Sequence, residues 1–568
     1  MDKLETLRHS TAHVLAQAVL ELHPKAKLAI GPPIDTGFYY DFGNLDIKQE
    51  DLAKIESKML EIIAKDFPFK KLKKTRKEAV RLLKDQPYKL EILKDLPNNN
   101  ITFYQDSDFI DLCAGPHIES TGKIKAFKLL KIAGAYWRGD SNRAMLTRIY
   151  GTAFPSKQEL DDFIKLQEEA ALRDHIKIGR ELDLFSMSEF SPGSAFLHNK
   201  GAIIWHEIEK YLRELYQKHS YQFVLTPIIM DNRLWKQSGH WDHYKDNMYF
   251  TKVGDRELGI KPMNCPGHIL IYKQNIHSYK ELPIRMAEFG IVHRLELSGV
   301  VHGLTRVRKM TQDDAHIFCT EEQIEKEIID LLHLIKEIYK VFGFKDYTVK
   351  LSTKPKNSMG DQMLWDKAEK SLENALKKTN LKYVVDKGEG AFYGPKIDFD
   401  IRDALNRPWQ LATIQLDFQM PERFEITYEG YDGKKHTPVI IHRAIIGSFD
   451  RFLGVLIEHT GGKFPLWLAP IQAKIVTISE KNAKFAHKLH EKMKAAGIRV
   501  EIDAGNDTIS KKVRDGQLQK VNYLVTIGDK EQSNKTLAIR TPDGKVKFGV
   551  KIDSFIEELK EKIAKKHA

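Results

Sequence analysis

The spacing of hydrophobic and polar residues changes along the chain, and each change predicts a different local structure. In the central part, residues 201–220 and 321–342 carry apolar positions at helical spacing, whereas the segments around them are β-rich. A short apolar strand, 223–227, follows the first of these helices. Because Pro227 cannot donate a hydrogen bond to a sheet ladder, this strand is expected at the end of a sheet or at an interface.

After Pro465 the pattern changes to alternating strands and helices, which predicts a small α/β domain with a partly parallel sheet. The expected strands are 474–479, 499–503 and 523–528, and the expected helices are 480–496 and 510–519. Before residue 155, short apolar strands accompany one Lys-rich helical stretch near 52–94. A charged helix over 156–180 is expected to link this first region to the rest of the chain.

The composition agrees with several ordinary globular domains, because 568 residues are too many for one hydrophobic core. A content of 42% hydrophobic and 30% charged residues excludes collagen-like and wholly disordered classes. Only three cysteines are present, which excludes a disulfide framework and indicates a reducing compartment. No apolar run has the length of an export signal or a membrane span. We therefore expect a cytoplasmic protein without a membrane partner.

The net charge of +12 is unevenly distributed. Residues 471–568 contain 21 Lys and Arg against 13 Asp and Glu, which is two thirds of the surplus. A solvated Lys-rich surface and a module that binds a polyanion such as RNA explain this surplus equally well at this point.

Two pairs of residues near the N-terminus have the spacing of a chemical site. His9 and His13 are four residues apart, so on a helix both imidazoles point to one place. Cys113 and His117 have the same spacing, but Gly115 and the proline after it predict a turn. The spacing of the set resembles that of metal ligands. Two interpretations are open at this point: one metal or hydrolytic site, or separate structural roles for the two pairs.

The middle of the chain concentrates groups that suit phosphate binding. Arg294, Arg306 and Arg308 flank Gly-rich connections, where their guanidinium groups can bind phosphate oxygens in pairs. Arg451 stands on an otherwise apolar helix, where burial is costly unless the guanidinium meets an anion. Cys265 lies among turn-forming residues, which leaves open an exposed thiolate or an inert buried thiol.

Together these segments resemble the class II aminoacyl-tRNA synthetases. The segment ending at Pro227 resembles motif 1, 294–296 resembles motif 2, and 447–451 resembles motif 3. Three further segments, 263–268, 311–318 and 409–418, are similar to the threonyl-tRNA synthetases in particular. The N-terminal Cys/His set, together with 136–140, is similar to the editing domain of that family. The resemblance covers nearly the whole chain.

The resemblance implies an α+β catalytic core with an antiparallel sheet, an α+β N-terminal editing domain and a small C-terminal α/β anticodon-binding domain. The boundaries that follow are an editing domain at 1–155, a linker helix at 156–180, a catalytic domain at 181–465 and an anticodon-binding domain at 466–568. Many bacterial members carry a small extra domain before the editing domain, and a chain of the type without it is expected here. The family's motif 1 also implies a homodimer.

The implied reaction is the ATP-dependent ligation of L-threonine to tRNA-Thr through a threonyl-adenylate. In the family one Zn²⁺ per subunit binds the amino and hydroxyl groups of threonine, and its ligands fall here on Cys265, His316 and His442. Valine lacks the hydroxyl and is rejected, whereas serine keeps it and is smaller by one methyl group, worth about 1–3 kcal/mol. Hydrolytic editing of seryl-tRNA-Thr is therefore expected, with His9, His13, Cys113 and His117 positioning water and ester without a metal.

The resemblance also assigns the remaining residues of each site. Mg²⁺ is expected with ATP. His240 is the candidate for proton transfer during aminoacyl transfer. The ATP and adenylate residues are Arg294, Glu296, Arg306, Gln410, Thr413 and Arg451; the threonine pocket has Met263, Gln312, Asp314, Tyr393, Lys396 and Gln415; the anticodon contacts are Arg514, Glu531 and Arg540.

Two sequence departures and two alternatives accompany this interpretation. Leu295 replaces a polar residue usual in motif 2, and Met310 replaces a phenylalanine; both are expected near the adenine, where they weaken stacking. A prolyl-type synthetase is one alternative, against which the zinc ligands argue. A catalytically silent RNA-binding regulator is the other, against which Arg294 and Arg451 argue. Amino-acid-dependent ATP–pyrophosphate exchange distinguishes all three.

Overall fold

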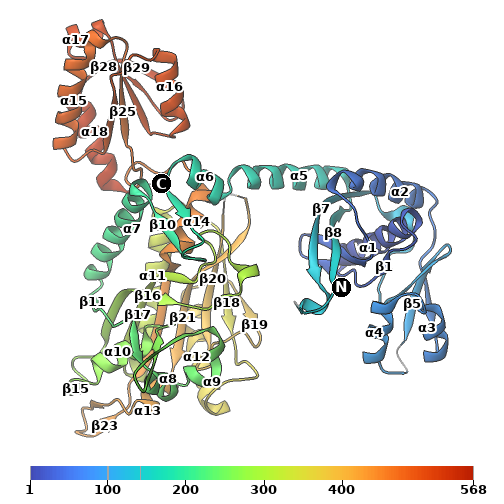
Figure 1. The fold of residues 1–568 in the computed structure, drawn as a ribbon. Coiled ribbons are helices and arrows are strands. Elements are labelled where there is room, and N and C mark those ends of the chain that lie inside the picture. Colours follow the sequence, from blue (N-terminus) through green and yellow to red (C-terminus); the bar gives the residue numbers. More distant parts are fainter. Residues whose placement is uncertain (1, 99–100, 141, 404, 567–568) are drawn as a thin grey trace. The chain divides into compact units, whose positions relative to one another are not determined.

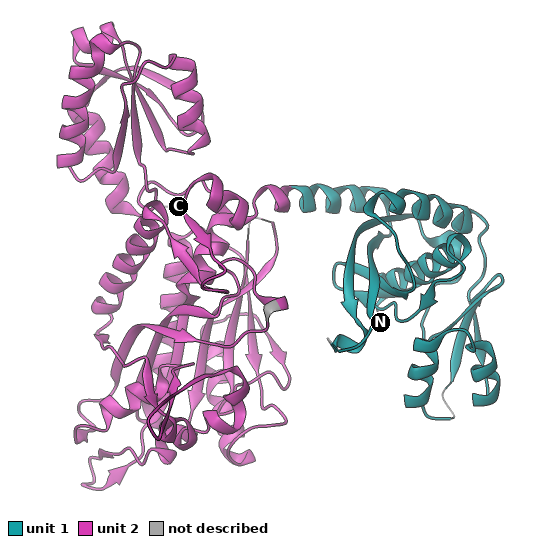
Figure 2. Ribbon diagram, viewed as in Figure 1, with its two compact units in different colours: residues 1–168 teal, residues 169–568 magenta. Residues whose placement is uncertain are grey.

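The computed structural model describes residues 2–98, 101–140, 142–403 and 405–566. Two compact units, Met1–Glu168 and Glu169–Ala568, divide the chain (Figure 2). The boundary falls within α5 (Lys157–Leu172), which is followed by α6 (His175–Glu181). The segment expected as one helix over 156–180 therefore comprises two, and Asp174 caps the second through the Lys177 amide. Among the described residues, no helix combines the length and apolar character needed to cross a bilayer.

The first unit is built around helix α1 (Lys3–Leu22), which begins at a capping box formed by Asp2 and Glu5. This helix packs on a five-stranded antiparallel sheet and on α2 (Leu52–Ala64), and their apolar side chains form one core (Figure 1). The strands of this sheet are β1 (Lys27–Leu28), β2 (Pro33–Ile34), β3 (Gly37–Gly43), β7 (Ala126–Tyr136) and β8 (Met145–Phe154).

The Lys-rich stretch near 52–94 is not one helix, so that expectation was wrong. After α2 the chain enters strand β4 (Lys70–Lys73) and then forms α3 (Arg76–Leu82) and α4 (Pro87–Asp95). Pro68 and Pro87 explain the breaks, because proline cannot continue a helix but suits its first position. Strand β4 pairs with β5 (Thr102–Asp106), which pairs with β6 (Phe109–Leu112).

The second unit contains an eight-stranded sheet that is antiparallel except at its two end pairs, which confirms the expected catalytic fold. Its strand order is β11 (Gln222–Phe223), β16 (Ile284–His293), β17 (Lys309–Cys319), β24 (Val439–Ser448), β21 (Pro408–Asp417), β20 (Lys396–Arg402), β18 (Tyr347–Ser352) and β19 (Tyr383–Asp386). Its core helices are α7 (Asn199–Lys218), α11 (Ile324–Val341), α12 (Gln362–Lys378) and α14 (Phe449–Thr460). Helices α7 and α11 confirm the predictions for 201–220 and 321–342.

The strand expected over 223–227 is short and lies at the sheet edge, where β11 pairs in parallel with β16. Smaller elements surround the large sheet; they include β9 (Phe185–Met187), β10 (Ala195–Leu197), β12 (Ile229–Asp231), β13 (Tyr249–Val253), β14 (Arg256–Ile260), β15 (His277–Ser278), β22 (Tyr428–Glu429), β23 (Lys435–His436), α8 (Asn232–Gln237), α9 (His240–Tyr244), α10 (Cys265–Tyr272) and α13 (Gln419–Arg423).

The C-terminal part of the second unit is a five-stranded, partly parallel sheet with its own core, as predicted. Strand β25 runs parallel to β26 and β27, whereas β28 and β29 pair antiparallel. In Figure 1 the sheet lies between α15 and α16. The elements are β25 (Ala473–Thr477), α15 (Ala483–Ala495), β26 (Val500–Asp503), α16 (Ile509–Leu518), β27 (Tyr523–Ile527), α17 (Asp529–Asn534), β28 (Thr536–Arg540), β29 (Val546–Lys551) and α18 (Ile552–Lys565).

Candidate active sites

A cavity of about 340 Å³ lies over the large sheet and gathers most of the residues expected around zinc, threonine and adenylate. Side-chain alternation explains how: in β17, residues 312, 314 and 316 share one face, while 315, 317 and 319 enter the core on the other. The predicted residues that line the cavity are Met263, Cys265, Arg294, Gln312, Asp314, His316, Tyr393, Lys396, Thr413, Gln415 and His442.

The three expected zinc ligands lie together in the lining of this cavity. His316 and His442 are directly paired across β17 and β24, so both side chains stand on the same face. Cys265 is the first residue of α10, and one donor atom from each residue lies within 4.8 Å of the others. The thiol is buried and not exposed, and burial beside Asp314 and Asp417 raises its pKa well above the ordinary value.

Hydrogen bonds to other residues fix which histidine nitrogens are free. His442 Nε2 lies 2.8 Å from Asp417 Oδ2, which leaves Nδ1 toward the group. His316 Nδ1 lies 2.9 Å from His268 Nδ1, and His268 Nε2 lies 3.1 Å from Glu288 Oε2. One sulfur and two nitrogens with an open fourth position fit the donor set of a catalytic zinc ion, and the supporting hydrogen bonds match those of such sites.

Sequence reasoning missed Asp417 and His268. Both were open to detection, since Asp417 is two residues from Gln415 on the same strand face and His268 is one helical turn after Cys265.

The residues expected around threonine are connected by hydrogen bonds. Asp314 Oδ2 accepts from Asn264 Nδ2 at 2.9 Å, and burial raises the pKa of the Asp314 carboxyl. The Tyr393 hydroxyl donates to Gln415, and Lys396 Nζ lies 2.6 Å from Asp398 Oδ2. The cavity thus presents a buried carboxylate suited to an ammonium group beside amide and hydroxyl groups.

The expected phosphate-binding arginines converge from three segments. Arg294 follows β16, and Arg306 precedes β17, where it pairs with Glu296 at 3.1 Å. Arg451 donates from Nε to the Thr305 carbonyl at 3.0 Å and from Nη1 to the Gln410 carbonyl at 3.4 Å. Burial and then the nearby Arg294 and Arg306 lower the pKa of Arg451. This concentration of positive charge fits a ligand with several negative charges.

His240 is fully buried at the start of α9, behind Met263. Its Nδ1 lies 2.7 Å from Ser238 Oγ, and its Nε2 lies 3.0 Å from Met263 Sδ and 3.8 Å from Cys265 Sγ. Burial, with a smaller effect of His442, lowers its pKa to about 3, so the ring is neutral. Its role in proton transfer stays a prediction.

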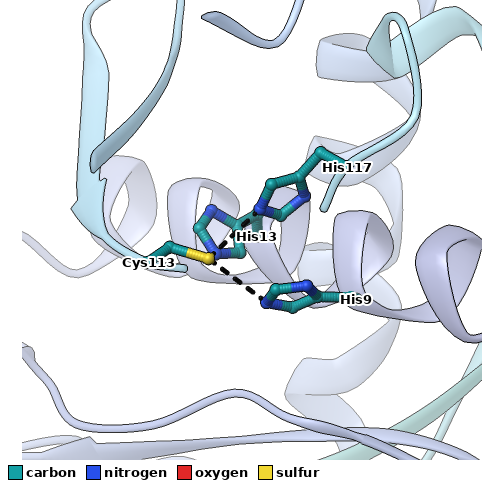
Figure 3. Close-up of side chains that lie close together, drawn as sticks. All are labelled: His9, His13, Cys113 and His117. Carbon is teal, nitrogen blue, oxygen red and sulfur yellow. Dashed lines mark hydrogen bonds between the residues drawn. The ribbon is translucent and has the colours of Figure 1, made fainter. Parts of the chain in front are cut away.

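The N-terminal Cys/His set comes together in the first unit (Figure 3). His9 and His13 lie on α1, and the turn after β6 carries Cys113 and His117. Cys113 Sγ is 3.4 Å from His9 Nε2 and 3.3 Å from His117 Nε2, and donor atoms of all four lie within 4.8 Å. Burial lowers the pKa of all three histidines and raises that of the Cys113 thiol to about 11.

A buried ion pair supports this set and was missed by sequence reasoning. Lys89 Nζ lies 2.8 Å from Asp111 Oδ1, and Tyr40 donates its hydroxyl to Asp111 Oδ2 at 2.7 Å. His13 Nε2 is 4.0 Å from the same carboxylate, and Ser10 Oγ is 3.0 Å from His117 Nδ1. The arrangement is a neutral imidazole–thiol cluster beside an ion pair, with groups that can orient water or hold a metal ion.

The three expected anticodon residues lie on separate elements of the C-terminal part. Arg514 is on α16, Glu531 caps α17 by accepting from the Gly528 amide at 3.0 Å, and Arg540 ends β28. Within the described ranges, no recorded hydrogen bond or ion pair joins these side chains. Arg540 lines a second cavity, of about 320 Å³, together with Lys463 and Lys520.

Comparisons with known proteins agree along the whole chain. Residues 249–460 match the tRNA synthetase class II core domain (G, H, P, S and T), 472–562 match an anticodon binding domain, and 101–150 match the threonyl and alanyl tRNA synthetase second additional domain.

Individual relatives agree with the family models. A threonine–tRNA ligase of Clostridium tetani is 54% identical over 541 residues, which are 94% of this chain and 84% of the relative. One from Carboxydothermus hydrogenoformans is 52% identical over 566 residues, 98% of this chain and 89% of the relative. The solved RNA-binding domain of threonyl-tRNA synthetase from Cryptosporidium parvum is 43% identical with a TM-score of 0.66, covering 68% of this chain and 98% of that one.

Proposed function

Because this chain belongs to the threonyl-tRNA synthetase family, we propose that it ligates L-threonine to tRNA-Thr through a threonyl-adenylate formed from ATP. As a threonine–tRNA ligase it takes ATP, an amino acid and tRNA as substrates. The relatives exclude the prolyl-type alternative and argue against a silent RNA-binding protein. The single observation that carries the finer proposal is that Cys265 lies beside the paired His316 and His442 in the cavity lining.

Cys265, His316 and His442 would hold one Zn²⁺ per subunit. Bound there, zinc would supply a Lewis acid for the amino and hydroxyl groups of threonine, the basis of discrimination against valine. Asp314, which is buried at the cavity wall, would accept the substrate ammonium, and Gln312, Tyr393 and Gln415 would orient the rest of the amino acid.

ATP, with Mg²⁺, would bind next to this pocket. Arg294 lines the cavity and would contact the α-phosphate, while Arg306 and Arg451 would neutralise the outer phosphates. Each guanidinium already has at least one oxygen partner, which holds it in place before the charge of the transition state develops. After adenylate formation, His240 is the proposed proton-transfer residue.

The N-terminal cluster would hydrolyse seryl-tRNA-Thr. The Cys113 thiol and the three histidines are all neutral at physiological pH, which suits orientation of a water molecule without a metal ion. Arg514, Glu531 and Arg540 are the proposed anticodon contacts. The positive surplus of this C-terminal part supports binding of the polyanion.

A homodimer is proposed through the edge strand β11 and the segment after it. Leu225, Ile228 and Ile229, which follow β11 in the chain, are exposed by 87%, 40% and 52%, respectively. Apolar side chains gathered beside an unpaired strand edge fit a protein partner. Leu225→Asp should give a monomer in sedimentation, and an unchanged dimer would contradict this interface.

The experiment that tests the central proposal combines activity with metal analysis. Threonine, but not proline, should support rapid ATP–pyrophosphate exchange by the purified protein, which should contain stoichiometric zinc. Cys265→Ser should lose both the zinc and the exchange. Retention of stoichiometric zinc in this variant would refute Cys265 as a ligand, and absence of exchange with every amino acid would refute the adenylation proposal.

A further inference from the structure

A third group of potential ligands, Asp174, His175 and His302, lies outside both sites. Their donor atoms come within 4.8 Å of one another, but both ring nitrogens of His175 are already engaged in hydrogen bonds. Its Nδ1 lies 2.6 Å from Glu458 Oε1, and its Nε2 lies 3.0 Å from the backbone nitrogen of Leu304. Because a backbone N–H can only donate, Nε2 must carry the lone pair and Nδ1 the proton. The ring is a neutral bridge between two fixed partners and not a metal ligand.

This bridge joins two segments that carry the proposed phosphate-binding arginines. Glu458 stands near the end of α14, the helix that bears Arg451. Leu304 precedes Thr305 and Arg306 in the connection between β16 and β17, and the Thr305 carbonyl accepts from Arg451 Nε at 3.0 Å. One buried imidazole thus holds the backbone one residue before the Arg451 acceptor and two residues before Arg306.

Close packing makes this arrangement rigid. Leu304 and His175 are completely buried, and a Cβ atom added at Gly303 would lie 2.1 Å from His175 Nε2. A Cβ at Gly454 of α14 would come within 3.2 Å of Leu304 and 3.1 Å of Thr305. Two glycines therefore allow the connection to lie directly against the imidazole on one side and against α14 on the other.

The other end of the bridge is also fixed. Glu458 Oε1 accepts from the backbone amide of His175 at 3.2 Å as well as from its ring, and Glu458 Oε2 accepts from Arg407. The carboxylate therefore cannot turn away from the imidazole without losing three hydrogen bonds. A loss of His175 would leave the Leu304 amide buried without a partner, which favours movement of the connection toward water.

We propose that His175 is a positioning residue for ATP binding: its bridge from Glu458 to the Leu304 amide sets the places of Arg306 and of the Thr305 carbonyl that holds Arg451. The inference rests on the proposed contacts of Arg306 and Arg451 with the triphosphate. His175 itself touches neither substrate nor adenylate, so its loss should act on ATP and not on threonine.

The test uses the full-length protein in threonine-dependent ATP–pyrophosphate exchange. His175→Phe keeps the ring volume and removes both hydrogen bonds, and KM for ATP should rise by about 5- to 150-fold, the range expected for one orphaned buried amide. KM for threonine should stay within about twofold of the parent value. Gly303→Ala, which pushes the ring away from the backbone side, should raise KM for ATP in the same direction.

His302→Ala is the matched control. This exposed imidazole contacts His175 edge-on at 5.5 Å, and no hydrogen bond of its side chain is recorded within the described ranges. The KM for ATP of the His302→Ala variant should equal that of the parent protein. If His175→Phe folds, as judged by its melting curve, and both KM values are unchanged or rise together, the role is only structural and the inference is wrong.

Arg451→Ala separates this inference from the function on which it rests. If Arg451→Ala raises KM for ATP but neither His175→Phe nor Gly303→Ala does, the positioning role fails alone. If Arg451→Ala leaves KM for ATP unchanged, the proposed phosphate contacts fail and the inference fails with them. Should His175→Phe not fold, Gly303→Ala gives the same decision on its own.

Discussion

Asp417→Asn conserves the shape of the side chain but should weaken zinc binding, because it moves the proton of the His442 imidazole from one ring nitrogen to the other. Asp417 is fully buried; its Oδ1 accepts from the amides of Gln419 at 2.7 Å and Met420 at 3.0 Å, and its Oδ2 faces His442 Nε2 at 2.8 Å. In the asparagine variant, the amide oxygen keeps the two backbone bonds. The amide nitrogen then replaces Oδ2 and can only donate.

The consequence follows from the tautomer of His442. Opposite a carboxylate, Nε2 carries the proton and Nδ1 offers its lone pair to the metal. Opposite an amide N–H₂ group, Nε2 must become the acceptor, so the proton moves to Nδ1 and occupies the ligand position. Loss of such a supporting partner typically weakens metal affinity by about 10- to 100-fold, which corresponds to about 1.4–2.7 kcal/mol.

The assay is competition for zinc between the protein and a chromogenic chelator of known affinity, with cobalt absorption spectra as a check on the ligand set. Asp400→Asn is the control, because Asp400 pairs with Lys350 at 2.9 Å on the same sheet and has no contact recorded with the three ligands. Equal zinc affinity in Asp417→Asn and the control would refute the tautomer argument, whereas cobalt spectra lacking a thiolate band in the parent would refute the site itself.

Three further outcomes are expected. Cys113, whose thiol pKa is raised to about 11, should react with iodoacetamide slowly at pH 7, with a rate that rises about tenfold per pH unit up to pH 9; intact mass and a Cys113→Ser control check this, and a pH-independent rate would indicate a metal-bound thiolate. His117→Ala should abolish deacylation of seryl-tRNA-Thr but leave threonine-dependent pyrophosphate exchange unchanged; equal deacylation by the variant would exclude the cluster as the editing site. Arg443→Met should lower the free energy of unfolding in urea by about 3–5 kcal/mol, because it leaves Asp313 buried without its cation, and a loss under 1 kcal/mol would contradict this.

The parts of the molecule that could be predicted from sequence are those whose partners are close along the chain. His9 and His13 share a helix face four residues apart, and 312, 314 and 316 share a strand face, so periodicity alone was sufficient. The proposed zinc ligands and arginine roles were predicted from family resemblance alone, because nothing in the sequence spacing joins Cys265 to His442. The prediction of one helix near 52–94 was wrong because it followed the residue composition and gave too little importance to two prolines.

The supporting residues could not be predicted for a related physical reason. Lys89 is 22 residues from Asp111, and His175 is 283 from Glu458, so no local pattern marks either pair. Each partner is buried, and a buried charge or imidazole is recognised only when the group opposite it is known. His175 lies in the charged segment 156–180, but its role depends on the backbone amide of Leu304, 129 residues away.

Asp313 shows why the two faces of β17 can serve core and site at once. The ladder between β17 and β24 shifts register between Gln312 and Asp314, which would leave the amides of Ile445 and Ile446 unpaired. The Asp313 carboxylate accepts from both, at 3.0 and 3.1 Å, and from Arg443 at 2.9 Å. A polar residue on the core face therefore binds the extra residues of β24, the strand that leads directly into α14, the helix that bears Arg451. The core residue that looks least suited to burial therefore fixes the segment of β24 that precedes the helix of Arg451.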